Sequence, residues 1–68
     1  MTNTIRVARA RHKLSQAALA ERVQVTRQTI NAVESGRFNP SAVLALKLAA
    51  VLQVRIDDLF TLEEGDWD

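Results

Sequence analysis

Two short amphipathic segments joined by only three residues place the strongest constraint on how this chain folds. Apolar residues at helical spacing predict one helix over residues 16–23 and a second over 27–35. Ser15 and Thr26 immediately precede these segments and are residue types that cap helix N-termini, and Gly36 suits the left-handed cap that ends the second helix. Because so short a connection leaves no room for a gradual bend, the second helix must leave the first at a sharp angle.

A close crossing of this kind needs small side chains where the two helices meet. Ala17 and Ala20 are expected to supply them, and Val25, an apolar residue inside the turn, is expected to fill the angle between the helices. A corner of this geometry occurs both as an ordinary pair of packed helices and as the helix-turn-helix that lies in a DNA groove. The choice between them depends on the exposed surface of the second helix.

The rest of the chain also follows helical spacing, which predicts an all-α domain of five short helices. Three further helices are expected over residues 4–12, 42–52 and 56–60; the polar residues 2–4 are candidate caps for the first of them and Ser41 for the second. The residues predicted to face the core are Ile5, Val7 or His12, Ala8, Leu19, Ala20, Val23, Ile30, Val33, Leu44, Ala45, Leu48, Ala49, Leu52, Ile56, Leu59 and Phe60.

The composition narrows the function classes open to such a domain. The chain has 68 residues, no cysteine and one histidine, so it makes one small domain without a disulfide framework and with too few ligands for structural zinc. His12 lies between Arg11 and Lys13 and no glycine-rich phosphate loop occurs, so we expect no enzyme activity and no cofactor. The most apolar run, 42–52, contains Lys47 and is too short to span a bilayer, so we expect a cytoplasmic protein without membrane association.

Charge is distributed unevenly along the chain. Residues 1–38 contain seven arginines and lysines against two glutamates, a net charge of +5, whereas residues 39–68 contain two basic against six acidic residues, a net charge of −4. Such asymmetry is expected when one face of a protein meets a polyanion, although charges often only solvate a surface. Charge by itself therefore favours nucleic acid as a partner without establishing it.

The exposed face of the helix over 27–35 carries a stronger functional signal. Burial of the two apolar residues of this helix turns the other positions outward, namely Arg27, Gln28, Asn31, Ala32 and Ser35. Glutamine and asparagine can each make two hydrogen bonds to an adenine edge, arginine can bond guanine or a phosphate, and alanine can contact the thymine methyl. An isolated pair of amides would more simply be solvated, so the prediction of a DNA-reading surface depends on their joint placement.

Residues spread over most of the chain, from Ile5 to Phe60, match the pattern of a known family. They include Leu14-Ser15-Gln16-Ala17-Ala18-Leu19-Ala20, Val23, Val25-Thr26-Arg27-Gln28-Thr29-Ile30, Val33-Glu34-Ser35-Gly36-Arg37, Pro40, Leu44, Leu48-Ala49, Leu52 and Leu59-Phe60. This pattern resembles the phage Cro/C1-repressor type helix-turn-helix, also called the xenobiotic-response-element family, and its small stand-alone members such as short bacterial repressors and restriction-modification controller proteins. The resemblance implies a lambda-repressor-like DNA-binding domain over residues 1–60, with a helix-turn-helix over 15–35, that acts as a transcriptional repressor on double-stranded DNA.

The resemblance also implies roles for individual positions. Gln16 and Arg37 would bond DNA phosphates, and Gln28 would read adenine from the major groove. The other members of the expected DNA-binding set are Thr26, Arg27, Thr29, Asn31 and Ser35. Glu34 resembles an inward acid that pairs with an arginine of the first helix, here Arg9, which makes both residues structural.

Two positions depart from the family pattern. Gln24 occupies a turn position that is often glycine, so a residue with a side chain must adopt a positive φ at a modest cost. Ala32 offers only a methyl group where some members carry a longer polar base reader, which argues against a polar base contact there.

Apolar residues beyond those that the core needs predict a symmetric homodimer bound to a near-palindromic operator. The expected interface comprises Val43, Leu46, Ala50, Val54, Phe60, Leu62 and Trp67. The acidic tail, 61–68, is a candidate dimerisation segment, and residues 60–63 could pair as a short C-terminal β-strand with the partner or with the N-terminal residues. The alternative is that these apolar residues are scattered over the surface and that the tail is frayed.

A second function class stays open from the residues: a protein-interaction or antitoxin-like module that uses the same fold to cover a partner. Salt-dependent binding to random duplex DNA separates the two classes, because a DNA reader binds weakly everywhere and tightly at its operator. We expect no small-molecule ligand, because a chain of this length leaves little room for a second pocket.

Overall fold

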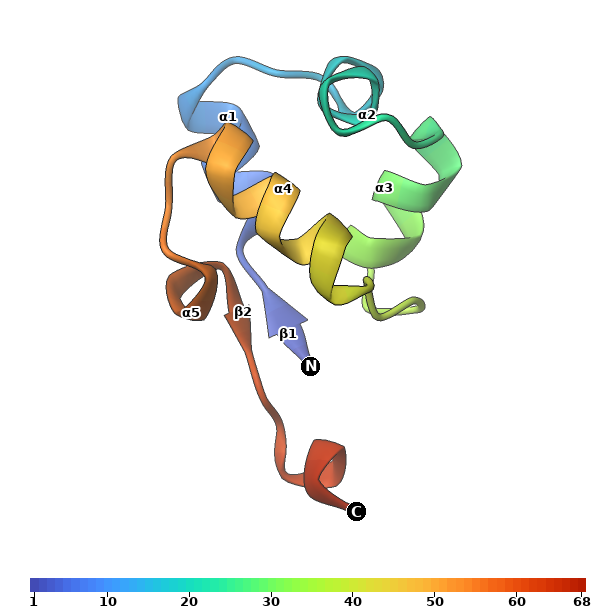
Figure 1. Ribbon diagram of the computed structural model, residues 1–68, viewed down its shortest axis with the longest axis vertical. Coiled ribbons are helices and arrows are strands. Elements are labelled where there is room, and N and C mark those ends of the chain that lie inside the picture. The colour runs from blue at the N-terminus through green and yellow to red at the C-terminus, as the bar shows by residue number, and fades with distance from the viewer.

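The computed structural model describes all 68 residues, and five α-helices make up most of it (Figure 1). The helices are α1 (Ile5–Arg11), α2 (Gln16–Val23), α3 (Arg27–Glu34), α4 (Ala42–Leu52) and α5 (Ile56–Leu59). Two short strands, β1 (Thr2–Asn3) and β2 (Phe60–Thr61), and a C-terminal 3-10 helix, η1 (Glu64–Trp67), complete the chain. The five predicted helices are confirmed, and each observed boundary lies within one residue of the predicted one.

Serine and threonine caps fix where three of the helices begin. Ser15, Thr26 and Ser41 each accept a hydrogen bond from the backbone N–H three residues ahead, at 3.0, 3.2 and 3.1 Å. Each bond satisfies an amide that the helix itself leaves unpaired, and such a cap contributes about 1 kcal/mol. Of the three candidate caps of α1, Thr4 makes no cap bond, and the Asn3 side chain accepts from the backbone N–H of Ile5 at 3.1 Å.

Residues in the left-handed backbone conformation mark the ends of several helices. Gly36, with φ of +80°, follows α3 as predicted, and Gln24, with φ of 63°, ends α2. The structure adds two positions that the sequence did not indicate, Lys13 with φ of 54° and Gln53 with φ of 57°. A side chain in this conformation costs about 1 to 2 kcal/mol relative to the right-handed region, so these turns depend on the packing around them.

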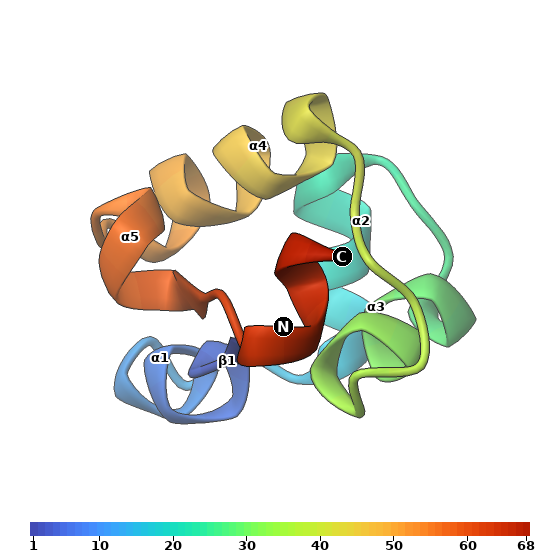
Figure 2. The ribbon, with the colours of Figure 1, turned by 90° about the horizontal axis from the view of Figure 1, so that it is seen from below.

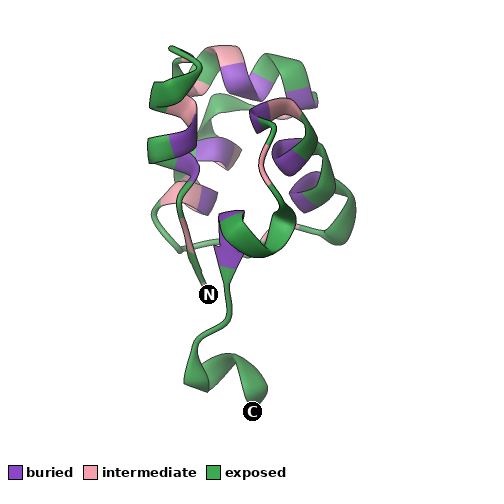
Figure 3. Ribbon diagram, turned by 90° about the vertical axis from the view of Figure 1, so that its left-hand side faces the viewer, coloured by how far each residue is buried: buried purple, intermediate pink, exposed green.

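The helices are arranged around a common centre (Figure 2), and their buried side chains form one core there. Its fourteen buried residues are all apolar, and they lie on the inward faces of the helices (Figure 3). Three predicted core positions are exposed instead, namely Val7, its alternative His12, and Ile56. Val7 is exposed because it lies two residues beyond Ile5 and therefore on the far side of α1. Ile56 is exposed because α5 is a single turn that directs only Leu59, at its other end, inward.

A small antiparallel sheet joins the two ends of the helical body. Thr2 lies opposite Thr61 and Asn3 opposite Phe60, so the C-terminal strand pairs with the N-terminal residues of the same chain. Phe60 is only 9% exposed and belongs to this chain's own core. Its expected place in a dimer interface is therefore corrected, because little of its side chain is left for a partner. Beyond the sheet, residues 62–68 extend away from the helices (Figure 1).

Candidate nucleic-acid interface

The corner between α2 and α3 is closely packed. The backbone N–H of Val25 donates to the carbonyl of Ala20 at 3.0 Å, Ala20 is buried, and the Val25 side chain packs against the core. Ala17 does not share this role, because it is exposed on the solvent side of α2. The Nζ atom of Lys47 in α4 donates to Oε1 of Gln24 at 3.2 Å and so braces the turn, a contact that the sequence analysis missed.

The outward face of α3 carries three of the expected DNA-binding side chains in exposed positions. Arg27, Gln28 and Asn31 line a shallow polar concavity of about 400 Å³, together with Arg37 from the loop after the helix. None of the lining residues is apolar or acidic, so two guanidinium groups face solvent beside two amides. This arrangement offers donors and positive charge to an acceptor-rich, anionic ligand, the chemistry of a DNA groove and backbone.

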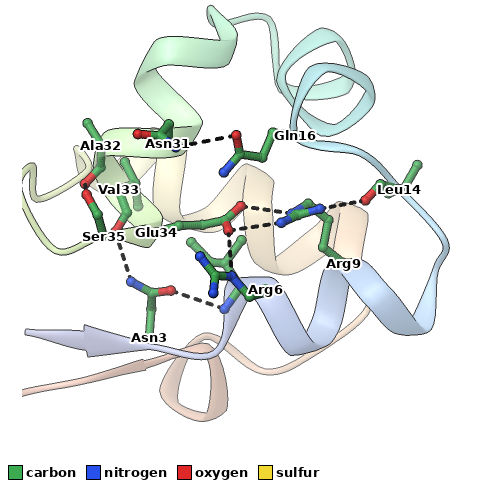
Figure 4. A network of polar contacts seen from close by, with 11 residues as sticks. Asn3, Arg6, Arg9, Leu14, Gln16, Asn31, Ala32, Val33, Glu34 and Ser35 are labelled. Carbon is green, nitrogen blue, oxygen red and sulfur yellow. Dashed lines mark hydrogen bonds and ion pairs between the residues drawn. The ribbon is translucent and has the colours of Figure 1, made fainter.

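Hydrogen bonds connect the expected DNA-binding residues around this concavity. The Arg37 guanidinium donates to Oδ1 of Asn31 at 2.7 Å and to Oγ of Ser35 at 3.0 Å. Asn31 in turn donates to Oε1 of Gln16, at the start of α2, across a longer 3.5 Å contact (Figure 4). The fold therefore brings residues from α2, α3 and the following loop onto one surface.

Three residues on or beside the outward face are not freely available to a ligand. Thr26 and Thr29 bond each other through their hydroxyls at 3.0 Å and are engaged in the cap of α3. Ala32 is half-buried rather than fully outward. Its carbonyl accepts from the backbone N–H groups of Arg37 and Phe38 at 3.0 and 3.2 Å, which draws the loop over the end of the helix.

Behind this surface, Arg9 of α1 holds Glu34 of α3 in a two-bond ion pair (Figure 4). The Nε–Oε2 and Nη2–Oε1 distances are 2.8 and 3.1 Å, and a third donor of Arg9 bonds the carbonyl of Leu14 at 2.9 Å. The Glu34 side chain is only 3% exposed, whereas a second arginine, Arg6, lies 3.8 Å from it and is 83% exposed. This pair fixes α1 against α3 and turns the one acid of α3 away from the concavity.

A further link from the N-terminal strand to α3 was missed as a functional contact. The Nδ2 atom of Asn3 donates to the backbone carbonyl of Val33 at 2.9 Å while its Oδ1 atom accepts from Ile5 (Figure 4). The only sequence signal was that asparagine is a capping residue. Its second bond to α3 depends on how the chain folds back.

Apolar side chains outside the core lie on two parts of the surface. Val43, Leu46 and Ala50 are exposed along α4, with Leu46 57% exposed, and Leu62 and Trp67 are exposed on the tail, with Trp67 at 76%. Val54, at the end of the α4 stripe, is half-buried and packs against the core.

Two short helices crossing at a tight turn, with arginine and amide side chains on the free face of the second, define a helix-turn-helix domain. The chain matches the family model described as helix-turn-helix over residues 5–59. It therefore belongs to the Cro/C1-type helix-turn-helix family of transcriptional regulators, which confirms the resemblance found in the sequence. This family is a class of DNA-binding regulators rather than a class of enzymes.

Similar proteins occur in distant organisms. A helix-turn-helix-type transcriptional regulator of Methanocaldococcus jannaschii is 42% identical, over 97% of this chain and 100% of its own length. The regulator YgzD of Bacillus subtilis is 45% identical, over 94% of this chain and 97% of its own. Among solved structures, the restriction-modification controller protein C.AhdI of Aeromonas hydrophila superposes with a TM-score of 0.75 at 38% identity, covering 82% of this chain and 85% of its own. None of the helices of the present structure has the length and apolar character needed to cross a membrane.

Proposed function

We propose that this regulator is a cytoplasmic repressor that binds a near-palindromic operator as a homodimer, with α3 in the major groove. The observation that carries the proposal is the joint placement of Arg27, Gln28 and Asn31 on the free face of α3, with Gln16 and Arg37 at its flank. Repression needs no further activity, because a protein seated on an operator blocks access to the DNA beneath it.

Gln28 and Arg27 are the proposed base readers. Both side chains are exposed in the first turn of α3, the part of a recognition helix that reaches deepest into the groove. The glutamine amide can bond adenine through N6 and N7, and the guanidinium can bond guanine through O6 and N7. Gln16 and Arg37 lie at the edges of the same surface, where they would contact phosphates and hold the helix in register.

A homodimer follows from the small footprint of one recognition helix. Two-fold pairing places two such helices about 34 Å apart, on successive turns of the major groove, and so doubles the number of base pairs read. Val43, Leu46 and Ala50 on α4, together with Leu62 and Trp67 on the tail, supply the exposed apolar surface that an interface needs. The domain over 1–60 would then read DNA, and the acidic tail, 61–68, would take part in dimerisation.

Selection of bound sequences from a random duplex pool, followed by footprinting, tests the proposal. The expected result is a near-palindrome whose half-sites lie about 10 base pairs apart, bound at least about a thousandfold more tightly than random DNA. Recovery of no common sequence, or of an asymmetric single half-site, would contradict it.

One observation favours a second candidate function, a module that covers a protein partner. Leu62 and the 76% exposed Trp67 lie on an acidic tail that extends beyond the helices. Large exposed apolar groups of this kind are found at protein interfaces. Binding to random duplex DNA at low and high salt distinguishes the two, because a module of this second kind would show no salt-dependent DNA binding.

A further inference from the structure

Arg37 is held in place at three points by the end of α3. Its backbone N–H donates to the carbonyl of Ala32 at 3.0 Å, its Nε atom donates to Oγ of Ser35 at 3.0 Å, and its Nη2 atom donates to Oδ1 of Asn31 at 2.7 Å. The last of these is a short bond from a charged donor, the stronger class of hydrogen bond. An exposed arginine side chain is ordinarily free to move. The three contacts of Arg37 restrict that motion, which points to a role for a fixed guanidinium.

These contacts use one edge of the guanidinium and leave the other free. The Nε and Nη2 atoms of Arg37 form the side edge of the group, and both already donate within the protein. The end edge, formed by Nη1 and the second proton of Nη2, has no partner in the structure and faces solvent beside the concavity. An arginine fixed this way can still make two parallel bonds to one phosphate or to one base edge.

The contacts that Asn31 makes with its neighbours compete with base reading by the same amide. Reading adenine with two bonds requires both the amide oxygen and the amide nitrogen to point at the base edge. The Oδ1 atom of Asn31 accepts from Arg37, and its Nδ2 atom points to Oε1 of Gln16 at 3.5 Å (Figure 4). Both ends of the amide are therefore directed at neighbouring side chains within the protein surface.

We infer that Asn31 is a positioning residue for the DNA backbone contacts and not a base reader. With Ser35 it holds the free edge of Arg37 in the direction of a phosphate. The ordering of a long side chain then occurs before DNA binds, so less conformational freedom is lost on binding. The inference rests on the proposed function and revises the base-reading or groove-contact role expected for Asn31 and Ser35.

A double-mutant cycle tests this coupling. The variants Asn31→Ala, Arg37→Ala and the double variant are compared with the parent for binding to the selected operator and to random duplex, over a range of salt concentrations. Asn31→Ala is expected to weaken binding about two- to tenfold on both DNAs alike and to flatten the salt dependence toward that of Arg37→Ala. The double variant is expected to bind as Arg37→Ala alone does, because the asparagine then has nothing left to position.

Two further variants keep the test specific. Ser35→Ala removes the other contact of the guanidinium and is expected to weaken binding in the same uniform way. Asn39→Ala is the matched control, because Asn39 is an exposed asparagine of the same loop that makes no side-chain hydrogen bond, and it is expected to bind as the parent does. Thermal unfolding confirms that each variant is folded.

The outcomes separate the inference from the proposed function. A changed preference at one base pair after Asn31→Ala, with the parent's salt dependence and with effects that add to those of Arg37→Ala, would make Asn31 a base reader and overturn the inference alone. Equal weakening by Asn39→Ala would overturn it too. A parent chain that binds no duplex in a salt-dependent way would overturn the proposed function.

Discussion

Removal of Arg9 is expected to destabilise this domain more than removal of any other charged side chain, because it leaves the buried carboxylate of Glu34 without its main partner. The substitution Arg9→Met keeps an unbranched, apolar stem but removes all three of the donors that Arg9 uses. The Glu34 carboxylate, which is 3% exposed, then keeps only its longer, 3.8 Å ion pair with the exposed Arg6. Breaking a buried pair from one side costs about 3 to 5 kcal/mol, chiefly through this stranded charge.

A second arginine near Glu34 places the expected loss of stability near the lower end of that range. Arg6 lies 3.8 Å from the same carboxylate and is 83% exposed, so it can move closer and compensate part of the charge. The total stability of a 68-residue domain is about 3 to 10 kcal/mol, so a loss of about 3 kcal/mol is still a large part of it. With a urea slope of about 1 kcal/mol per M, the unfolding midpoint should fall by about 3 M.

Urea unfolding followed by circular dichroism at neutral pH measures this loss. Arg11→Met is the matched control, because Arg11 is an exposed arginine of α1 without an ion pair, and its effect should stay within about 0.5 kcal/mol. The double variant Arg9→Met/Glu34→Met should recover much of the stability, since an apolar pair of similar size leaves no buried charge. A parent-like midpoint for Arg9→Met would refute the reasoning, and so would a double variant no more stable than Arg9→Met.

The remaining predictions concern base reading, dimerisation and the tail. Gln28→Ala should cost about 1 to 3 kcal/mol at the selected operator and relax preference at one base pair, measured by competition with operators altered at single positions; unchanged selectivity would mean that α3 docks differently. Leu46→Glu should convert a dimer to a monomer in sedimentation at micromolar concentration, whereas Phe38→Glu, at an exposed apolar residue outside the proposed interface, should not; a parent that already sediments as a monomer would contradict the dimer. The α-amino group of the chain has its pKa raised by a hydrogen bond to Asp66, and the same bond lowers the pKa of the Asp66 carboxyl. The carboxyl's contribution is therefore present above its ordinary pKa of about 4 and lost as the pH falls through the lowered value, while the amine's is present below about 8 and lost as the pH rises through the raised value. The fluorescence of Trp67, the only tryptophan, should accordingly change at both extremes and stay level near neutral pH, and a flat profile throughout would show that this contact does not order the tail.

The sequence by itself determined the helices and most of their inward faces. A cap such as Ser15 or Thr26 acts on an amide three residues ahead, and an apolar stripe such as Leu19 and Val23 repeats within one helix, so both are readable from neighbouring residues. The outward placement of Gln28 follows from the same period. These features are local in the chain, which is why pattern alone predicted the helix-turn-helix and the face that it presents.

Only the tertiary structure decided features that join distant parts of the chain. The pairing of β1 with β2 brings the two ends together and draws Phe60 into the core, and nothing within either two-residue strand specifies its partner. The hydrogen bonding of the Asn31 amide was likewise decided by the tertiary structure. Its amide is directed by Arg37 from the following loop and by Gln16 from another helix, so helical period could turn this residue outward but could not tell whether its hydrogen bonds were still free for DNA.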